Sequence, residues 1–568
     1  MRYKTALVVA VAVGAIAGGA ARGQTRDQGG WFLDDVRVPA KLVPRANLKP
    51  VVIAIVDDAL RITHRDLADL IWTNPLEIQG NRVDDDGNGH VDDVHGWDVS
   101  DDDGDVGAPA NRTDLYHGTH LAGIVATVVR AAYGDAAPRV VRIMPIKALA
   151  DNSRTTAIAN GYAGITYAVA AGADIIICSW GVGQITPQES RVLQDAADKG
   201  ILVMASGGNL PEEREQFPAA HATVLAVTST DQRGQKVANA NFGQFIDIAA
   251  PGVAIRGASP ASDDGYDVRD GTSQATAITG AAAALIKLQH PSFSPREIEA
   301  CLLSASAPIE SPGREFSAKL GAGKLNIEAA VACRLLVDDT PPTNRLVHTK
   351  GFLHGRNTSA APINWAIEPP GEFSGIRFRL VPGRGQAARG RLEFRADRSP
   401  DARVVASHPL DALPASVYVA GGTAYVTFIP DGNPGPAGWL MQYEAAAIDF
   451  RTLYCRGTKD IREEGTLTDG SGPANYSART DCRWHITAPP GKVIRFRVDD
   501  FDTEAKVDLV SFFNGAAALQ EQLMAILSGP GTTPTEVTTW SHEVLVWFVT
   551  DGRNQGRGWQ MTYRFVDR

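Results

Sequence analysis

The sequence predicts an α/β domain with a parallel sheet flanked by helices, followed by two all-β domains of the sandwich type. Three observations lead to this expectation. From residue 51 to about residue 332, unbroken apolar runs alternate with helix-like segments, as in a parallel sheet that is buried on both faces. After Asp338 the chain is rich in short strand-like runs, Gly and Pro. Within this second half, one set of residues recurs about 120 residues further on.

The first half of the chain contains the elements expected for the α/β domain. Its apolar runs show no polar alternation, so we expect buried parallel strands at residues 51–56, 142–149, 173–178 and 201–205. Residues 156–171 and 188–199 lie between these runs and are expected to form helices.

The second half contains an internal repeat after a short linker. Residues 339–343 include two consecutive prolines and are predicted to be the linker. Among the recurring residues, Phe428, Trp439 and Tyr443 return as Phe548, Trp559 and Tyr563. Chance agreement at a constant spacing is rare, so we interpret residues 344–447 and 452–568 as two tandem β domains. One large β domain with a coincidental echo is the alternative.

The N-terminal residues have the pattern of a secretory signal peptide, assigned to residues 1–23. Arg2 and Lys4 precede an apolar run over residues 6–17, and small side chains suited to signal peptidase follow it. This run is too short to favour a membrane anchor, and no other stretch has membrane-spanning length. We therefore expect a secreted protein, extracellular or periplasmic, with no membrane span in the mature chain. An uncleaved N-terminal helix is the alternative.

The charge pattern excludes one class of partner. The net charge is −10 over 568 residues, and the basic residues form no long block. Nucleic acid is therefore not an expected partner. The acidic balance instead suggests calcium.

The chain has five cysteines, an odd number. Export implies an oxidising compartment, where we expect a disulfide between Cys455 and Cys482. Cys301 and Cys333 could pair with each other. Cys178 ends an apolar run, so it is expected to be a buried free thiol. A cysteine nucleophile is set aside because no histidine constellation accompanies this residue.

Three separated segments carry residues suited to acyl transfer by a serine. That chemistry needs a base for the hydroxyl proton, an acid that orients the base, and donors for the oxyanion. Asp57 ends the first strand, at the edge where parallel sheets place reactive groups. His117 opens the segment HGTHLAG, and Ser273 lies in DGTSQAT before an alanine-rich run. Each alone has a structural explanation, such as a turn-capping Asp or an N-capping Ser.

Together these segments closely resemble the aspartate, histidine and serine motifs of subtilisin-like serine peptidases, over about residues 51–326. The resemblance implies a subtilisin-like peptidase domain at residues 24–336. It implies an endopeptidase that hydrolyses protein or peptide substrates through an acyl-enzyme, with no cofactor for catalysis. The implied triad is Asp57, His117 and Ser273, with the amide of Asn209 as a donor to the oxyanion.

The resemblance also implies a substrate-binding segment at Ser179, Trp180 and Gly181. In the family, the equivalent segment pairs with extended substrate backbone as an added strand. Trp180 could then wall a specificity pocket, and a core tryptophan is the alternative.

Departures from the family pattern leave a second function open. Asp58 and Ala59 stand where many members have Thr or Ser and then Gly, and Ala277 replaces the usual Pro after Ser273. The alternative is a catalytically inactive peptidase scaffold that acts as a secreted adhesion or binding protein. The intact set of four implied catalytic residues favours the enzyme.

An acidic loop between the aspartate and histidine segments predicts a structural calcium site. Oxygen ligands lie at alternate positions, and Gly89 falls where an EF-hand loop needs its sharp turn. The flanking helices and the bidentate Glu of an EF-hand are missing. The predicted ligands are Asp84, Asp86, Asn88, His90 and Asp92. A solvated acidic turn is the alternative.

Residues 455–563 resemble a CUB domain, through features that include Cys455, Cys482 and the Gly558-Trp559 pair. The resemblance implies a second calcium site at Glu504, Asp508 and Asp551, although the spacing of the first two is shorter than usual. Residues 344–447 would be a degenerate copy without cysteines. Such modules usually bind protein or glycan surfaces, so we expect them to direct the peptidase to a substrate or a cell surface.

Overall fold

The structure is a computed structural model that describes residues 30–568 apart from short gaps. The gaps are residues 46–47, 310–315, 317–318, 334–343, 357–360, 370–372, 382–388, 403, 415, 432–437, 447–457, 470–475, 477–479, 532–534 and 551–555. The predicted signal peptide, residues 1–23, lies outside the described residues. Among the helices that the structure does describe, none combines the length and the apolar character needed to span a membrane.

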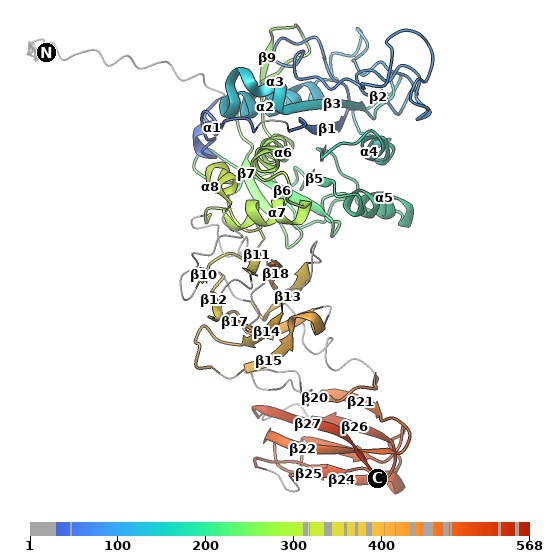
Figure 1. The fold of residues 1–568 in the computed structure, drawn as a ribbon, viewed down its shortest axis with the longest axis vertical. Helices are drawn as coiled ribbons and strands as arrows, with labels where there is room; N and C mark the ends of the chain where they lie inside the picture. Colours follow the sequence, from blue (N-terminus) through green and yellow to red (C-terminus); the bar gives the residue numbers. More distant parts are fainter. Residues whose placement is uncertain are drawn as a thin grey trace, which may run out of the picture.

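The first part of the chain folds around a seven-stranded parallel sheet (Figure 1). The strand order is β2-β3-β1-β4-β5-β6-β7. The strands are β1 (Val51–Asp57), β2 (Trp97–Asp98), β3 (Val141–Lys147), β4 (Ile175–Cys178), β5 (Leu202–Ser206), β6 (Val224–Thr230) and β7 (Ile248–Pro251). A separate hairpin pairs β8 (Ile255–Ala258) with β9 (Tyr266–Arg269).

Two hydrophobic cores lie on opposite faces of this sheet, because successive side chains of each strand point to opposite sides. Ile53 and Ile55 of β1 join one core, and Ala54 and Val56 join the other. The first core includes α2 (His117–Tyr133), α6 (Thr272–Gln289), α7 (Pro295–Ser304) and α8 (Ile327–Ala332). The second includes α4 (Gly161–Ala170) and α5 (Pro187–Asp198). Short helices α1 (Phe32–Asp35) and α3 (Ala137–Val140) complete the helical layer. The predicted parallel sheet flanked by helices is confirmed.

The expected strands agree with β1, β3, β4 and β5 to within about two residues, whereas one helix begins late. Residues 156–171 are expected to be helical, but α4 begins at Gly161. Backbone groups of the expected first turns bond elsewhere: the N–H of Ala157 donates to Oγ1 of Thr155 at 3.4 Å, and the N–H of Asn160 donates to the carbonyl of Ala148 at 3.2 Å. Such local bonds compete with the first turn of a helix.

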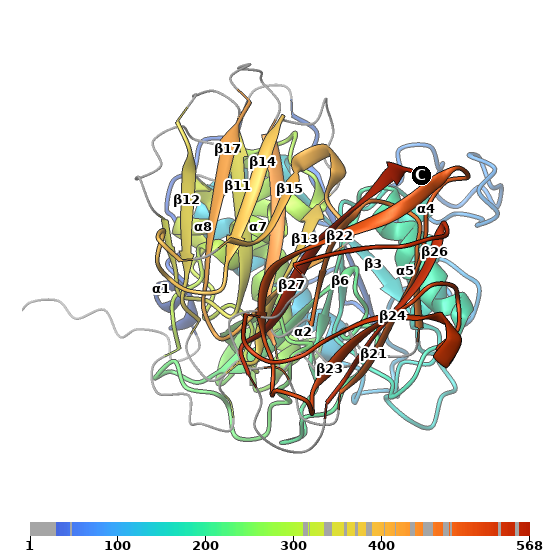
Figure 2. The ribbon, with the colours of Figure 1, turned by 90° about the horizontal axis from the view of Figure 1, so that it is seen from below.

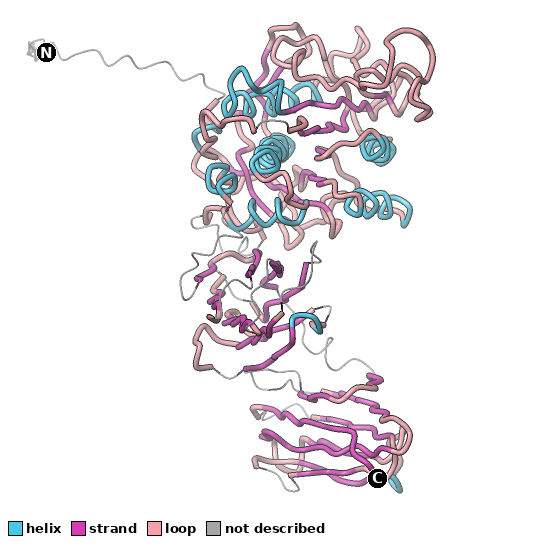
Figure 3. Tube along the Cα trace, in the orientation of Figure 1, coloured by secondary structure: helices cyan, strands magenta, loops and turns pink. Residues whose placement is uncertain are grey.

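The rest of the described chain forms two β domains with helices nearly absent (Figure 3). The first β domain contains β10 (Asn344–Leu346), β11 (Lys350–Arg356), β12 (Ile363–Ile367), β13 (Gly375–Val381), β14 (Gly390–Arg395), β15 (Val404–Pro409), β16 (Val417–Ala420), β17 (Ala424–Pro430) and β18 (Gly438–Ala446). The second β domain contains β19 (Thr458–Ile461), β20 (Gly465–Thr468), β21 (Asp481–Thr487), β22 (Lys492–Asp502), β23 (Leu509–Phe513), β24 (Leu523–Leu527), β25 (Glu536–Thr538), β26 (Glu543–Val549) and β27 (Gly558–Asp567).

Both β domains have the same strand order in two sheets. The first has β10-β12-β17-β14-β15 and β11-β18-β13-β16, and the second has β19-β21-β26-β23-β24 and β20-β27-β22-β25. Each strand of one therefore has a counterpart in the other. Figure 2 shows the second β domain in two layers, with β22 and β27 in one and β21, β23 and β24 in the other. The predicted pair of all-β sandwich domains is confirmed.

The recurring residues of the sequence occupy matching positions in the two β cores. The rings of Trp365 and Trp439 meet edge to face with centroids 5.5 Å apart, and those of Trp484 and Trp559 do the same at 5.5 Å. Each pair lies in its own hydrophobic core. The alternative of one large β domain with a coincidental echo is therefore wrong.

The cysteines fall into three groups. Cys301 and Cys333 form a disulfide between α7 and the end of α8. Cys178 is a free, buried thiol, and burial raises its pKa well above the ordinary value. Cys482 is disulfide-bonded, and Cys455, its expected partner, lies outside the described residues.

Candidate active site

Asp57 and His117 meet at the carboxyl end of β1. Asp57 is the last residue of β1, and His117 is the first residue of α2. Nδ1 of His117 lies 2.8 Å from Oδ1 and 3.0 Å from Oδ2 of Asp57, whose side chain is buried. Burial by itself would lower the pKa of His117, but the charge of Asp57 and this hydrogen bond outweigh it and raise the pKa to about 9.

A glycine lets the first turn of α2 approach β1 this closely. A Cβ on Gly118 would lie 2.6 Å from the carbonyl oxygen of Ala59 and 3.1 Å from Cβ of Asp57. Any larger side chain would push the start of α2 away from the strand. Glycine is therefore required directly after His117, because only a residue without a Cβ lets the imidazole reach Asp57.

Asp58 holds the start of the same helix. Its carboxylate accepts the backbone N–H groups of His117 at 3.0 Å and Gly118 at 2.8 Å, which are unsatisfied donors of the first helical turn. Burial, followed by the charge of Asp57, raises the pKa of Asp58 to about 6. In the sequence Asp58 stands out only as a departure from the family pattern, which gives no sign of this capping role.

Ser273 stands at the start of a helix that packs against α2. It is the second residue of α6, and its Oγ donates to the carbonyl of Ser179 at 3.3 Å. Gln274 Nε2 lies 3.4 Å from Nδ1 of His120, one turn after His117, so the first turns of α2 and α6 face each other. Between these described residues no hydrogen bond joins Ser273 Oγ to the imidazole of His117. Catalytic hydrogen bonds are often looser without substrate.

Asn209 follows β5 and its side chain reaches the same helix start. Its Oδ1 accepts both the backbone N–H of Thr272 at 2.9 Å and the hydroxyl of Thr272 at 3.0 Å. A backbone N–H can only donate, so this bond fixes which atom of the amide is oxygen. The amide nitrogen is left to donate elsewhere and lies beside Gly271, where a Cβ would stand 3.3 Å from it.

The segment Ser179, Trp180 and Gly181 follows β4 and adjoins Ser273. The indole of Trp180 donates to the carbonyl of Val56 at 3.0 Å and keeps only 9% of its surface exposed. A Cβ on Gly161 would lie 2.2 Å from this ring, so the indole rests on the start of α4. These contacts favour the core interpretation of the Trp180 side chain.

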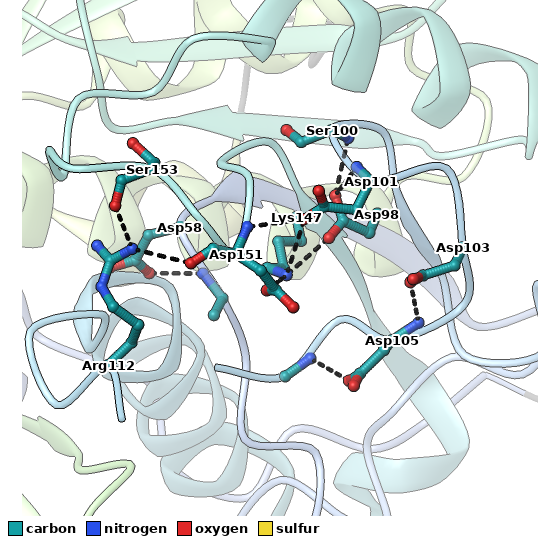
Figure 4. Close-up of polar contacts among 12 residues, drawn as sticks. Asp58, Asp98, Ser100, Asp101, Asp103, Asp105, Arg112, Lys147, Asp151 and Ser153 are labelled. Carbon is teal, nitrogen blue, oxygen red and sulfur yellow. Dashed lines mark hydrogen bonds and ion pairs between the residues drawn. The ribbon is translucent and has the colours of Figure 1, made fainter. Parts of the chain in front are cut away.

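A buried lysine organises the acidic loops beside the site (Figure 4). Nζ of Lys147, at the end of β3, lies 2.6 Å from Oδ2 of Asp98 and 3.8 Å from Asp101, and it also pairs with Asp151. The carboxylates of Asp98, Asp101 and Asp151 are close enough together to bind one cation, and the ammonium group of Lys147 is that cation. Since Lys147 is the register neighbour of Asp57, this cluster fixes the loops around the strand end that carries the catalytic candidate.

The structure groups only part of the predicted calcium ligands. Carboxylate oxygens of Asp84, Asp86 and Glu77 lie within 4.8 Å of one another. Glu77 was missed because it lies outside the alternating pattern of the loop. Asn88 adjoins the group and donates its backbone N–H to Asp84 at 3.1 Å and to Asp86 at 3.0 Å.

The other two predicted ligands have different contacts. Both carboxylate oxygens of Asp92 accept backbone N–H groups, from Gly80 at 2.7 Å and from Arg82 at 2.9 Å. The ring of His90 lies against Trp97 and Tyr167. A close group of three carboxylates supplies the hard oxygen donors that Ca²⁺ prefers, so Glu77, Asp84 and Asp86 fit this ion.

The metal residues predicted in the second β domain are described only in part. Asp508 is buried, its backbone N–H donates to the carbonyl of Glu504 at 3.1 Å, and its carboxylate accepts the hydroxyl of Tyr476. The third residue, Asp551, lies outside the described residues.

Comparison with known proteins gives two family matches. Residues 49–328 match the subtilase family, and residues 455–563 match the CUB domain. Thermitase of Thermoactinomyces vulgaris is 34% identical over 286 residues, which cover 49% of this chain and 88% of that protein. Subtilisin BL of Lederbergia lenta is 30% identical over 224 residues, which cover 39% of this chain and 80% of that protein. Among solved structures, a prenylagaramide maturation protease matches with 26% identity and a TM-score of 0.38, over 50% of this chain and 92% of that one.

Proposed function

The chain belongs to the subtilase family, and we propose that it is a secreted endopeptidase in which Asp57, His117 and Ser273 form the catalytic triad. As a subtilisin-like serine peptidase, it acts on protein or peptide substrates. The observation that carries the triad is the 2.8 Å contact between Nδ1 of His117 and the buried carboxylate of Asp57. This contact fixes the tautomer that leaves Nε2 to take a proton.

In the proposed mechanism the hydroxyl of Ser273 leaves the carbonyl of Ser179 and attacks the scissile carbonyl carbon. Nε2 of His117 takes the hydroxyl proton and returns it to the leaving amine, while Asp57 stabilises the imidazolium. A water molecule then hydrolyses the acyl-enzyme by the same proton route. The amide nitrogen of Asn209 and the backbone N–H of Ser273 donate to the oxyanion. Loss of one such donor typically lowers kcat by about two to three orders of magnitude.

Labelling with a fluorophosphonate tests this proposal. We expect the wild-type protein to be labelled and to hydrolyse casein, and Ser273→Ala to abolish both, because the variant has no nucleophile. Ser190→Ala, which removes a hydroxyl from the outer helix α5, is the matched control and should keep both activities. Casein hydrolysis at the wild-type rate by Ser273→Ala would exclude the mechanism.

The inactive-scaffold alternative is not favoured. The altered helix after Ser273, in which Ala277 replaces the usual Pro, motivates this alternative. Asp58 caps α2 and supports the position of His117. After Ser273, the helix keeps a close approach at Gly280, where a Cβ would lie 2.5 Å from the side chain of Ile177 in β4. The departures are therefore compatible with a working site.

We further propose that Glu77, Asp84 and Asp86 hold a structural calcium ion. The ion would neutralise three carboxylates that otherwise repel one another, and it would fix the loop between β1 and β2. No step of catalysis requires it.

For the C-terminal CUB domain we propose a role in binding a protein or glycan surface near the substrate. Export is supported by the N-terminal charge and apolar pattern and by the disulfide-bonded cysteines, which persist in oxidising compartments. The expected location is extracellular or periplasmic.

A further inference from the structure

A lysine of the first β domain is buried against the α/β domain. Nζ of Lys350, the first residue of β11, lies 3.0 Å from Oδ1 of Asp247, which directly precedes β7 of the central sheet. The other oxygen of Asp247 accepts the N–H of Ala226 in β6 at 2.8 Å. Burial alone would lower the pKa of Lys350, but the carboxylates of Asp247 and Glu444 hold it above the ordinary value. The ammonium of Lys350 therefore stays charged although it is buried between the first β domain and the α/β domain.

Lys350 belongs to a cluster of charged side chains drawn from both domains. Arg296 pairs with Glu299 at 2.5 Å on α7 of the α/β domain, and Arg377 pairs with Glu444 between strands β13 and β18 of the first β domain. Lys350 stands between the two groups, 3.0 Å from Asp247 and 3.6 Å from Glu444. Arg379 lies 3.9 Å from Glu444, and Glu299 interacts electrostatically with both Asp247 and Lys350. The cluster thus contains the carboxylates Asp247, Glu299 and Glu444 and the cations Lys350, Arg296, Arg377 and Arg379. Removing one partner would leave a buried charge uncompensated, which destabilises strongly.

The hydrophobic core also crosses the boundary. Phe352 of β11 and Leu440 of β18 belong to the same core as Leu303 of α7 and Val331 of α8. The hydroxyl of Thr349 donates to the carbonyl of Gly321 at 2.9 Å. Apolar burial, a hydrogen bond and an ion cluster therefore join these two domains, as inside a single domain.

The second β domain is organised differently. All members of its core, including the partly buried ones, come from residues 461–565. Its ion pairs among described residues are internal, as between Lys492 and Asp567 at 2.8 Å. Since its core and its ion pairs are internal, this domain has the features of an independently folded module.

From these contacts we propose that the first β domain is an integral part of the peptidase unit rather than a binding module. It is docked permanently on α7 and on the start of β7, and Lys350 locks it there. The folded catalytic unit therefore extends to about residue 446, and only the second β domain serves as a separate recognition module. This proposal does not depend on the catalytic roles assigned above.

Calorimetry of the full chain tests this assignment. We expect one transition in which the α/β domain and the first β domain unfold together, and a separate one for the second β domain. Hydrogen exchange during heating should show α6 and β13 losing protection together. If α6 and β13 lose protection at clearly different temperatures in the wild-type protein, the proposal is wrong.

Variants of Lys350 separate charge from packing. Lys350→Met keeps an aliphatic side chain and removes the ammonium, and Lys350→Ala removes both. Both should lower the temperature of the shared transition, by roughly 5 °C or more, and leave the other transition unchanged. Lys492→Ala, whose partner Asp567 is 90% exposed, is the matched control and should shift neither transition by more than about 1 °C. A shared transition unmoved by both Lys350 variants would overturn the locking role.

A cut chain provides a second measurement that needs no peptidase activity. A recognition sequence for a specific protease is inserted between Asp338 and Asn344, and the full-length protein is cleaved after folding. The two pieces should elute together in gel filtration, and Lys350→Ala should make them separate. Pieces of the otherwise wild-type protein that elute apart would contradict permanent docking. The Ser273→Ala experiment measures labelling and hydrolysis, whereas calorimetry and gel filtration measure docking of the first β domain. Failure of the proposed catalytic mechanism is therefore distinguishable from failure of the docking proposal.

Discussion

The imidazole of His117 has two carboxylates beside it. Asp57 accepts from Nδ1, and Asp58 accepts the N–H groups of the same helical turn. Burial by itself would lower the pKa of His117, but these two charges raise it to about 9. Burial lowers the pKa of the neighbouring His120 to about 4, so that ring adds no charge at higher pH. A general base acts only in its neutral form, so activity should be lost as pH falls through the pKa of His117.

Asp58→Asn tests the contribution of the second charge. Removing that charge favours the neutral imidazole, so the acidic limb of kcat/KM should move to lower pH, by about one unit or less. The measurement is kcat/KM on a chromogenic peptide between about pH 5 and pH 10. Asp114→Asn, at an exposed partner of Arg112, is the control and should leave the limb in place. A limb that moves to higher pH in Asp58→Asn would contradict the assignment.

The residues of the candidate site differ in how far the sequence could predict them. Asp57, His117 and Ser273 are predicted as a triad because each lies in a motif whose neighbours are also diagnostic, and the structure brings Asp57 and His117 into contact. The capping by Asp58 could not be predicted, since it depends on where the first turn of α2 lies in space. Glu77 could not be predicted either, because the chain brings it to the acidic loop from outside the alternating pattern.

At the scale of elements, burial decided which predictions succeeded. The strands were predictable because a strand covered on both faces must be apolar throughout, as in β1 and β4. The start of α4 was not predictable from the apolar pattern, since the backbone N–H groups of Ala157 and Asn160 bond to Thr155 and Ala148 and not within a helical turn. The sequence repeat predicted that the two β domains have the same fold. It did not predict the strand order, because strands that pair lie far apart in the sequence.

The acidic loop between β1 and β2 carries the three carboxylates of the proposed calcium site. If Glu77, Asp84 and Asp86 hold calcium, the ion stabilises the folded state by mass action, about 2.7 kcal/mol at a hundredfold excess over Kd. Chelation should therefore lower the Tm of the wild-type protein, and added calcium should restore it.

Glu77→Gln is the informative variant, because Glu77 belongs to the carboxylate cluster of the folded protein but not to the ligand set predicted from the loop sequence. It should lose most of the calcium dependence of Tm. Asp135→Asn, at an exposed carboxylate after α2, is the control and should keep it. A wild-type Tm that does not respond to chelation would rule out the site.

At the scale of the whole molecule, three domains behave as two units. The core beneath α7 continues into the first β domain, whereas the core of the second β domain is its own. The sequence predicted three domains from composition and repeat. It could not predict that two of them share a core, because the two copies of the repeat look alike in sequence. Only the first copy places residues, Lys350 and Phe352, against the α/β domain.

Removing the second β domain tests the division of labour between these units. A chain that ends at residue 447 keeps the catalytic candidates, the shared core and the Lys350 cluster. It should therefore hydrolyse a short chromogenic peptide with kcat/KM within about twofold of the full chain, since none of the interactions that position the triad is lost. The Tm of its single transition should equal that of the shared transition in the full chain. Loss of activity on the short peptide would mean that the second β domain supports the catalytic unit and is not an independent recognition module.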